Sequence, residues 1–165
     1  MIYQRPTDLE ILRDVCLHAT RFSSDPHTQN AAALAAANSV VLLAANAVPY
    51  HLDATYELLK RPEKYNFIEH AERAVIYKAA SVGLATEGAT LYCPWFACTD
   101  CARAIILAGI REVVGLAAHR AATPARWREN IDTACRMLEE AGVGQRWLAG
   151  AVGVTMRFDG RDFRC

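Results

Sequence analysis

Residues 89–116 read ATLYCPWFACTDCARAIILAGIREVVGL, and this stretch decides the fold. It begins with a short apolar run at 89–94, continues through a helical pattern at 98–108, and ends, after Gly109, in a second apolar run at 112–116. Short apolar runs on either side of a helix predict two buried strands that lie parallel in one sheet. The stretch therefore indicates an α/β fold.

Three further amphipathic patterns outside this stretch predict helices, because apolar residues recur along one face. They lie at 7–22, 69–82 and 124–141. The first begins with a capping box, in which Thr7 and Glu10 are placed to bond each other's backbone N–H groups. Residues 147–158 are expected to supply a fifth strand and a tail.

Residues 31–48 read AAALAAANSVVLLAANAV and are nearly uncharged. A membrane-spanning helix is one interpretation, but a span needs about 20 apolar residues and alanine is only weakly apolar. Asn38 and Ser39 divide the run into two halves of strand length, which favours a buried hairpin with its turn there and no membrane partner. The polar segment 49–67 that follows is expected to be irregular, apart from a helical turn at 57–60.

The order of these elements is helix, hairpin, helix, strand, helix, strand, helix, strand. Strands that alternate with helices late in a chain predict parallel pairs within a layered sheet. We therefore predict a single domain over residues 1–165, of class α/β, with three α/β/α layers and a mixed five-stranded sheet.

The charge and the cysteines limit the function. The 165 residues carry 18 basic and 18 acidic side chains, a formal net charge of zero. Proteins that hold extended nucleic acid usually show a basic field, so a small-molecule substrate is favoured. The N-terminus lacks the pattern of a signal peptide, which predicts a cytoplasmic protein with reduced cysteines.

Cys98 and Cys101 form a C-x-x-C pair at the start of the helix expected over 98–108. Residues three apart share one face of a helix, so both sulfurs can bind one metal, and their place in the first turn lowers their pKa. By itself, C-x-x-C fits either a zinc site or a redox-active thiol pair. A redox pair is expected near the N-terminus, whereas this one lies in mid-chain.

His70 and Glu72, in the sequence HAE, favour zinc over redox chemistry. One histidine and two cysteines give zinc three protein ligands and leave a fourth position for water, as in catalytic zinc sites. Zinc lowers the pKa of that water toward about 7. Glu72 lies two residues from the ligand, so it can move protons beside the metal without binding it.

H-x-E followed by C-x-x-C is typical of zinc deaminases. The sequences EHAERAVIYKAA at 69–80 and ATLYCPWFACTDCARAIILAGIREVVG at 89–115 resemble the cytidine and deoxycytidylate deaminase superfamily, and the likeness extends over 23–116. DPHTQNAA at 25–32 and AANAVP at 44–49 resemble its deoxycytidylate branch. The resemblance implies one zinc ion per chain, deamination of a cytosine-type nucleotide such as deoxycytidylate, and a homodimer or larger homo-oligomer.

The resemblance also suggests substrate contacts. Asn46 matches the asparagine that binds the sugar, although it could instead be a turn residue at a strand end. Ala71 lies between the two motif residues and is included among the expected contacts. Trp95 and Phe96 precede the cysteine helix; at least one is expected to form a wall of the base pocket, with core packing as the alternative.

Three positions depart from the family pattern. Ala97 replaces the proline that usually precedes the first cysteine, which affects only the start of the helix. Ala74 replaces a frequent asparagine, and His51 replaces a glycine near the phosphate. The last two departures put a substrate phosphate in question but not deamination.

Other functions remain open on the sequence alone. The deaminase could act on a free base, such as cytosine or guanine, or on a nucleoside. An RNA-editing deaminase is disfavoured by the zero net charge. A catalytically inactive binding protein would be expected to lose Glu72 or a ligand, and a structural zinc module would need a fourth protein ligand, for which Cys93 is the candidate.

Overall fold

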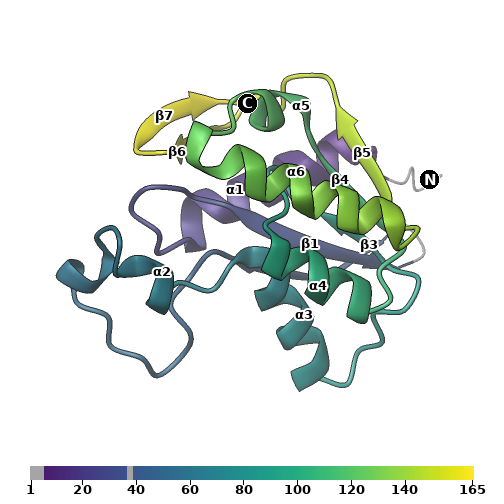
Figure 1. Ribbon diagram of the computed structural model, residues 1–165, viewed down its shortest axis with the longest axis horizontal. Coiled ribbons are helices and arrows are strands. Elements are labelled where there is room, and N and C mark those ends of the chain that lie inside the picture. Colours follow the sequence, from purple (N-terminus) through teal and green to yellow (C-terminus); the bar gives the residue numbers. More distant parts are fainter. Residues whose placement is uncertain (1–5, 37–38) are drawn as a thin grey trace, which may run out of the picture.

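The computed structural model describes residues 6–36 and 39–165, and Figure 1 shows how their helices and strands are arranged. The main sheet has five strands in the order β2-β1-β3-β4-β5. Their bounds are Ala31–Ala36 for β1, Ser39–Ala45 for β2, Thr90–Tyr92 for β3, Glu112–Leu116 for β4 and Gly144–Leu148 for β5. β1 pairs antiparallel with β2 and β3, whereas β3, β4 and β5 run parallel. The prediction of a mixed five-stranded sheet is confirmed.

Helices cover both faces of this sheet, which confirms the three predicted layers (Figure 1). The long helices are α1 (Asp8–Phe22), α3 (Ala71–Ser81), α4 (Thr99–Leu107) and α6 (Ala125–Glu140). Leu12 and Val15 of α1 pack in one core cluster, while the apolar faces of α3, α4 and α6 pack in another. The predicted capping box of α1 is present, since the Thr7 N–H donates to the Glu10 carboxylate at 2.7 Å.

The two core clusters are separated by the sheet itself. Leu91 of β3 and Val113 of β4 belong to the cluster beneath α3, α4 and α6. Their neighbours Tyr92 and Val114 belong to the cluster beneath α1. Successive side chains of a strand point to opposite faces, so both faces of these strands are buried and their sequences read as continuous apolar runs.

The hairpin predicted over 31–48 is present as β1 and β2. Its predicted turn at Asn38 and Ser39 falls partly outside the described residues, because Asn38 is not described and Ser39 is the first residue of β2. The expectation that the hairpin is buried holds for β1 but is wrong for β2, because β2 is the edge strand of the sheet and its first three residues, 39–41, are exposed. No helix within the described part of the chain is long and apolar enough to cross a membrane.

The expectation for 147–158 is wrong in its bounds. The fifth strand is β5, and its pairing with β4 runs from Glu112 opposite Gly144 to Leu116 opposite Leu148. Residues 149–154 are irregular, with positive φ at Gly150 and Gly153. Residues 155–158 pair with residues 161–164 in a separate two-stranded sheet.

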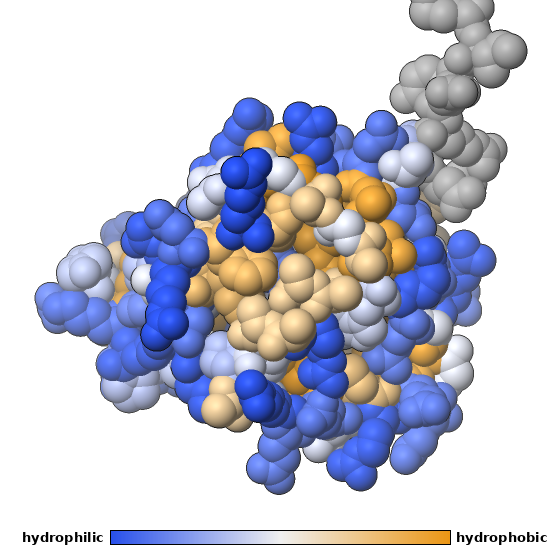
Figure 2. Space-filling view, turned by 90° about the horizontal axis from the view of Figure 1, so that it is seen from above, coloured by the Kyte–Doolittle hydropathy of each residue, from blue (hydrophilic) through white to orange (hydrophobic). Residues whose placement is uncertain are grey.

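Several short elements complete the fold. They are the 3₁₀ helix η1 (Tyr56–Leu59), α2 (Lys64–Phe67), α5 (Ala117–Ala121), β6 (Thr155–Phe158) and β7 (Arg161–Arg164). The helical turn expected at 57–60 corresponds to η1, whereas α2 and α5 were not expected from the sequence. Seen from above, the end of the molecule that carries β5, α5 and β7 shows a patch of apolar residues with hydrophilic residues around it (Figure 2).

Candidate active site

The N-terminal ends of α3 and α4 bring together three side chains that could bind a metal ion. His70 is the N-cap residue of α3, Cys98 is the N-cap residue of α4, and Cys101 follows in the first turn. The two helices therefore begin after their first ligands, later than the sequence pattern predicted. The Nδ1 atom of His70 lies 3.5 Å from the Cys98 sulfur and 3.6 Å from the Cys101 sulfur, and the two sulfurs are 3.4 Å apart.

This triangle has the dimensions of a zinc site. Tetrahedral zinc, with bonds of about 2.3 Å to sulfur and about 2.0 Å to nitrogen, requires its donors to be roughly 3.5–3.8 Å apart. Three donors at such distances leave the fourth corner of the tetrahedron free. Histidine with two thiolates is a donor set that zinc prefers. The residues present therefore fit a catalytic zinc ion.

Arg73 places a positive charge beside the two sulfurs. Its Nη1 atom lies 3.9 Å from the sulfur of Cys98 and 3.8 Å from that of Cys101. Its Nε–H donates to the Glu69 carboxylate at 2.7 Å, which fixes the guanidinium in this position. A hydrogen bond joins the sulfurs of Cys98 and Cys101, and it is the main cause that lowers the pKa of Cys98. One thiolate is thus available at neutral pH for a metal.

Glu72 is the second residue of α3 and is 3% exposed. Burial raises the pKa of its carboxyl to about 7, partly opposed by the nearby His70. A carboxyl with such a pKa is present in both protonation states near neutral pH. It can therefore accept a proton and return it within one reaction cycle.

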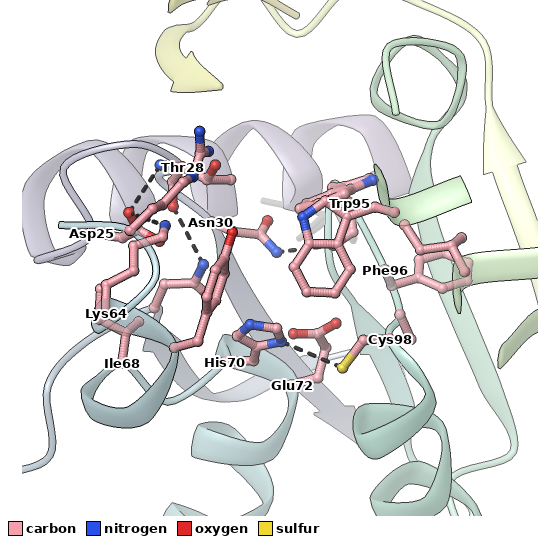
Figure 3. A pocket seen from close by; sticks show the side chains of 16 residues that line it. Asp25, Thr28, Asn30, Lys64, Ile68, His70, Glu72, Trp95, Phe96 and Cys98 are labelled. Carbon is pink, nitrogen blue, oxygen red and sulfur yellow. Dashed lines mark hydrogen bonds and ion pairs between the residues drawn. The ribbon is translucent and has the colours of Figure 1, made fainter. Parts of the chain in front are cut away.

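A pocket opens above these residues, with an empty volume of about 590 Å³ that includes its mouth. Its walls come from the loop before β1, the end of β2, the segment around α2, the two motif helices and α6 (Figure 3). The lining residues are Asp25, Thr28, Asn30, Asn46, Arg61, Lys64, Tyr65, Ile68, His70, Glu72, Trp95, Phe96, Ala97, Cys98, Trp127 and Ile131. His70, Glu72 and Cys98 lie together at one end, and Asp25 and Lys64 lie at the other (Figure 3).

A comparison with known families agrees with this geometry. The model of the cytidine and deoxycytidylate deaminase zinc-binding region matches residues 6–117, well over half of the chain. The chain belongs to this family. The deaminase is 30% identical over 128 residues to an uncharacterized deaminase in the luxG 3′ region of Aliivibrio fischeri. The aligned residues cover 77% of this chain and 84% of the relative.

Solved structures confirm the fold of the deaminase. The deoxycytidylate (dCMP) deaminase of cyanophage S-TIM5, in complex with dCMP and dUMP, superposes with a TM-score of 0.64 and 19% identity, covering 84% of this chain and 93% of the phage chain. Acinetobacter baumannii RibD superposes with a TM-score of 0.58 and 16% identity, covering 85% of this chain and 34% of RibD. At these identities the likeness establishes a shared fold.

Asn46 lines the pocket of the deaminase and also holds the start of α3. Its Oδ1 accepts the Ala71 N–H at 2.9 Å, and its Nδ2 donates to the Thr28 carbonyl at 3.3 Å. One Nδ2 hydrogen remains to donate to a ligand. Ala71 itself is fully buried behind the site and is outside the set of described residues that line the pocket.

Trp95 and Phe96 both reach the pocket but differ in their surroundings. The Trp95 indole is half-buried, donates to the Thr123 hydroxyl at 3.1 Å, and lies edge-on to Trp127. Phe96 is 1% exposed and stacks on Trp147 with ring centroids 3.8 Å apart. Trp95 is therefore the better placed of the two to form a wall for a base, and Phe96 is mainly a core residue.

The packing of Phe96 depends on a glycine in β4. A Cβ added at Gly115 would lie 2.7 Å from the Phe96 ring and 2.9 Å from the Cys93 carbonyl oxygen. Gly115→Ala is expected to destabilise the fold by about 1–3 kcal/mol, because the ring that supports the pocket must shift. Urea unfolding measures the change. Gly144→Ala in β5 is the matched control, because its nearest neighbour, a flexible Glu112 side chain, is 3.4 Å away. Equal midpoints for the two variants would contradict this packing role.

Several pocket residues were not found from the sequence. Trp127 and Ile131 come from α6, whose helical pattern was predicted without a role in the site. Asp25 and Lys64 form a buried ion pair, with the ammonium 2.6 Å from a carboxylate oxygen. Their separation in sequence gives no signal of this contact. His51 lies in an exposed loop, with a positive φ of 68°, and does not line the pocket described here.

Proposed function

We propose that this deaminase is zinc-dependent, with one ion per chain on His70, Cys98 and Cys101, and that it hydrolyses a cytosine-type nucleotide, first of all deoxycytidylate, to the uracil form and ammonia. The observation that carries this proposal is the triangle of donors with the buried Glu72 carboxyl beside it, at one end of a pocket. The predicted homo-oligomer and cytoplasmic location remain predictions.

The bound metal would supply a water molecule of lowered pKa as the nucleophile. Glu72 accepts the proton of this water and delivers it to the ring nitrogen next to the reacting carbon. Glu72 then takes the proton of the hydroxyl group added to the ring carbon and passes it to the exocyclic amine. The bond from carbon to nitrogen breaks, ammonia leaves, and the ring keeps a carbonyl oxygen. A pKa of about 7 suits a single carboxyl for both directions of transfer.

The shape of the pocket supports a flat substrate. Tyr65 and Trp95 each lie edge-on to Trp127, with ring centroids 6.0 and 6.2 Å apart, and His70 lies edge-on to the same indole. Aromatic walls of this kind suit a pyrimidine or purine ring. The overall neutrality of the chain supports a small substrate over an RNA.

Lys64 supplies positive charge at the end of the pocket away from the candidate metal ligands (Figure 3), and Arg61 also lines the pocket. These charges support a phosphate on the substrate. A second candidate, a nucleoside or free base, is favoured by a specific observation at the same place. Lys64 is already paired with Asp25, and Arg61 with Asp159 at 2.6 Å. A phosphate would have to share or displace these carboxylates.

A substrate screen with one pair of variants tests the sugar contact. Asn46→Asp keeps an oxygen to accept the Ala71 N–H but loses the Nδ2 donor. We expect kcat/KM for deoxycytidylate and deoxycytidine to fall by about 10–100-fold, from the loss of one buried hydrogen bond, and that for cytosine to change little. Asn46→Ala removes the helix cap as well and is expected to lower stability too. A wild type that prefers free cytosine would favour the second candidate, and no deamination of any cytosine substrate by zinc-loaded protein would refute the proposal.

A further inference from the structure

Asn30, the residue before β1, is fixed within the pocket wall. It is 3% exposed, and its Nδ2 donates to the Trp95 carbonyl at 2.9 Å and to the Cys93 sulfur at 3.3 Å. Turning the amide over would place Oδ1 against the Trp95 carbonyl, acceptor to acceptor. The orientation is therefore determined, with the nitrogen toward Trp95 and the oxygen turned away from it (Figure 3).

The Oδ1 atom of Asn30 is buried and has no hydrogen-bond partner among the described residues. Asn46, the other asparagine of the pocket, uses both ends of its amide within the protein. Buried polar atoms are almost always paired, so an unpaired acceptor held in a pocket wall indicates a donor supplied by a ligand.

The surroundings of Asn30 place it toward the reacting end of the pocket. Cys93, which it contacts, lies close enough to Glu72 for that carboxylate to help raise the pKa of the thiol, after the larger effect of burial. Trp95, its other partner, leads directly into the loop that carries Cys98. The Trp95 carbonyl also accepts from the Cys93 thiol at 3.3 Å and is therefore already occupied. Among the described residues that line the pocket, Oδ1 of Asn30 is the buried side-chain acceptor left without a partner.

We propose that Oδ1 of Asn30 accepts a hydrogen bond from the exocyclic amine that is removed from the substrate. This inference rests on the proposed function, because in a glycosylated cytosine the exocyclic amine carries the base's only N–H groups, while the ring nitrogen and the carbonyl oxygen accept. In the reaction, the water oxygen bonds to the ring carbon and Glu72 carries one water proton to the ring nitrogen. Glu72 then carries the second water proton to the amine, the bond from carbon to the amine nitrogen breaks, and ammonia leaves a carbonyl oxygen on the ring. Asn30 keeps its bond to the nitrogen until the ammonia departs.

One consequence is that Asn30 distinguishes substrate from product. The uracil product carries an oxygen where the substrate carried the amine, so two acceptors then face each other. The structure thus assigns to Asn30 a preference for the aminated base and a part in releasing the oxo product.

The test measures binding in the Glu72→Gln background, which is expected to hold zinc and ligand without turnover. Calorimetry compares deoxycytidylate with its product, deoxyuridylate, with and without Asn30→Leu. We expect Asn30→Leu to weaken deoxycytidylate binding about tenfold, as for one buried hydrogen bond, and not to weaken deoxyuridylate binding, because it also removes the acceptor that faces the product oxygen. In Asn30→Asp, burial and a mildly acidic buffer keep the new carboxyl protonated, so it donates to the Trp95 carbonyl and retains a free oxygen. This variant is expected to keep the wild-type ratio of deoxycytidylate affinity to deoxyuridylate affinity.

Equal weakening of both ligands would overturn the proposal, since it would show a sugar contact or a structural role. Cytosine and uracil are measured as a second pair of ligands. If Asn30→Leu does not weaken cytosine binding relative to uracil binding, Oδ1 contacts the sugar and the proposal is overturned. Failure of the proposed function is seen separately, as no deamination by wild type. If wild type deaminates another base, the same comparison is made with that base and its oxo product. If Asn30→Leu leaves the ratio of the two affinities unchanged there, the proposed role of Asn30 is refuted.

Discussion

Replacing Glu72 with glutamine is expected to lower kcat by about 10⁴-fold, at the upper end of what one general acid or base contributes. The expected effect is large because, in the proposed mechanism, one buried carboxyl serves each proton transfer, to the ring nitrogen and then to the amine. Glutamine has nearly the same shape but cannot accept or release a proton at this pH. The zinc content and the melting temperature are expected to stay near those of wild type.

Steady-state kinetics, with zinc measured on the same samples, checks this result. Glu69→Gln is the matched control, because it removes the same charge three residues away while its side-chain oxygen still accepts the His70 N–H. We expect kcat of this control to fall by less than about tenfold, in line with the weak effect of a partly exposed ion pair. A Glu72→Gln enzyme that keeps a third of wild-type activity would remove Glu72 from the mechanism.

Changing Cys98 or Cys101 to serine is expected to abolish both zinc binding and turnover. A neutral hydroxyl is a far poorer zinc ligand than a thiolate, and two remaining ligands do not hold the ion. The sulfurs lie 3.4 Å apart, so each loss opens the same triangle. Elemental analysis after zinc supplementation should give about one equivalent for wild type and well below a third for either variant.

Cys93→Ser separates this open site from a closed four-ligand site. Cys93 donates to the Trp95 carbonyl and stands outside the group of described residues that could hold the metal. A serine there can donate in the same way, so zinc is expected to remain at about one equivalent. Loss of zinc on this change would make Cys93 a fourth ligand and would favour the structural zinc module.

The parts of the site that lie close together in sequence could be predicted, and those that meet only through the fold could not. His70 and Glu72 are two residues apart, and Cys98 and Cys101 are three apart, so helical geometry alone relates each pair. Lys64 meets Asp25 across 39 residues, and Asn46 meets the N–H of Ala71 across 25. Contacts between residues so far apart in sequence depend on how the helices and strands pack, and a local sequence pattern does not predict that packing.

The error in the fifth strand has a related cause. Val152, Val154, Met156 and Phe158 are buried and alternate with exposed residues, which is a true strand pattern. The pattern does not say which strand is its partner. β5 pairs with β4, whereas residues 155–158 pair with β7 in a sheet of their own. A period of two predicts a strand, but the choice of partner depends on the turns and the packing around it.

The wall formed by Trp127 and Ile131 lies beyond residue 117, where the match to the family model ends. Part of the pocket wall is thus carried by a different part of the chain from the candidate metal ligands and Glu72. Such a division lets natural variation in α6 change the accepted base without disturbing the metal ligands. For enzyme design, the face of α6 toward the pocket is accordingly the first place to diversify when a new amine-bearing substrate is wanted.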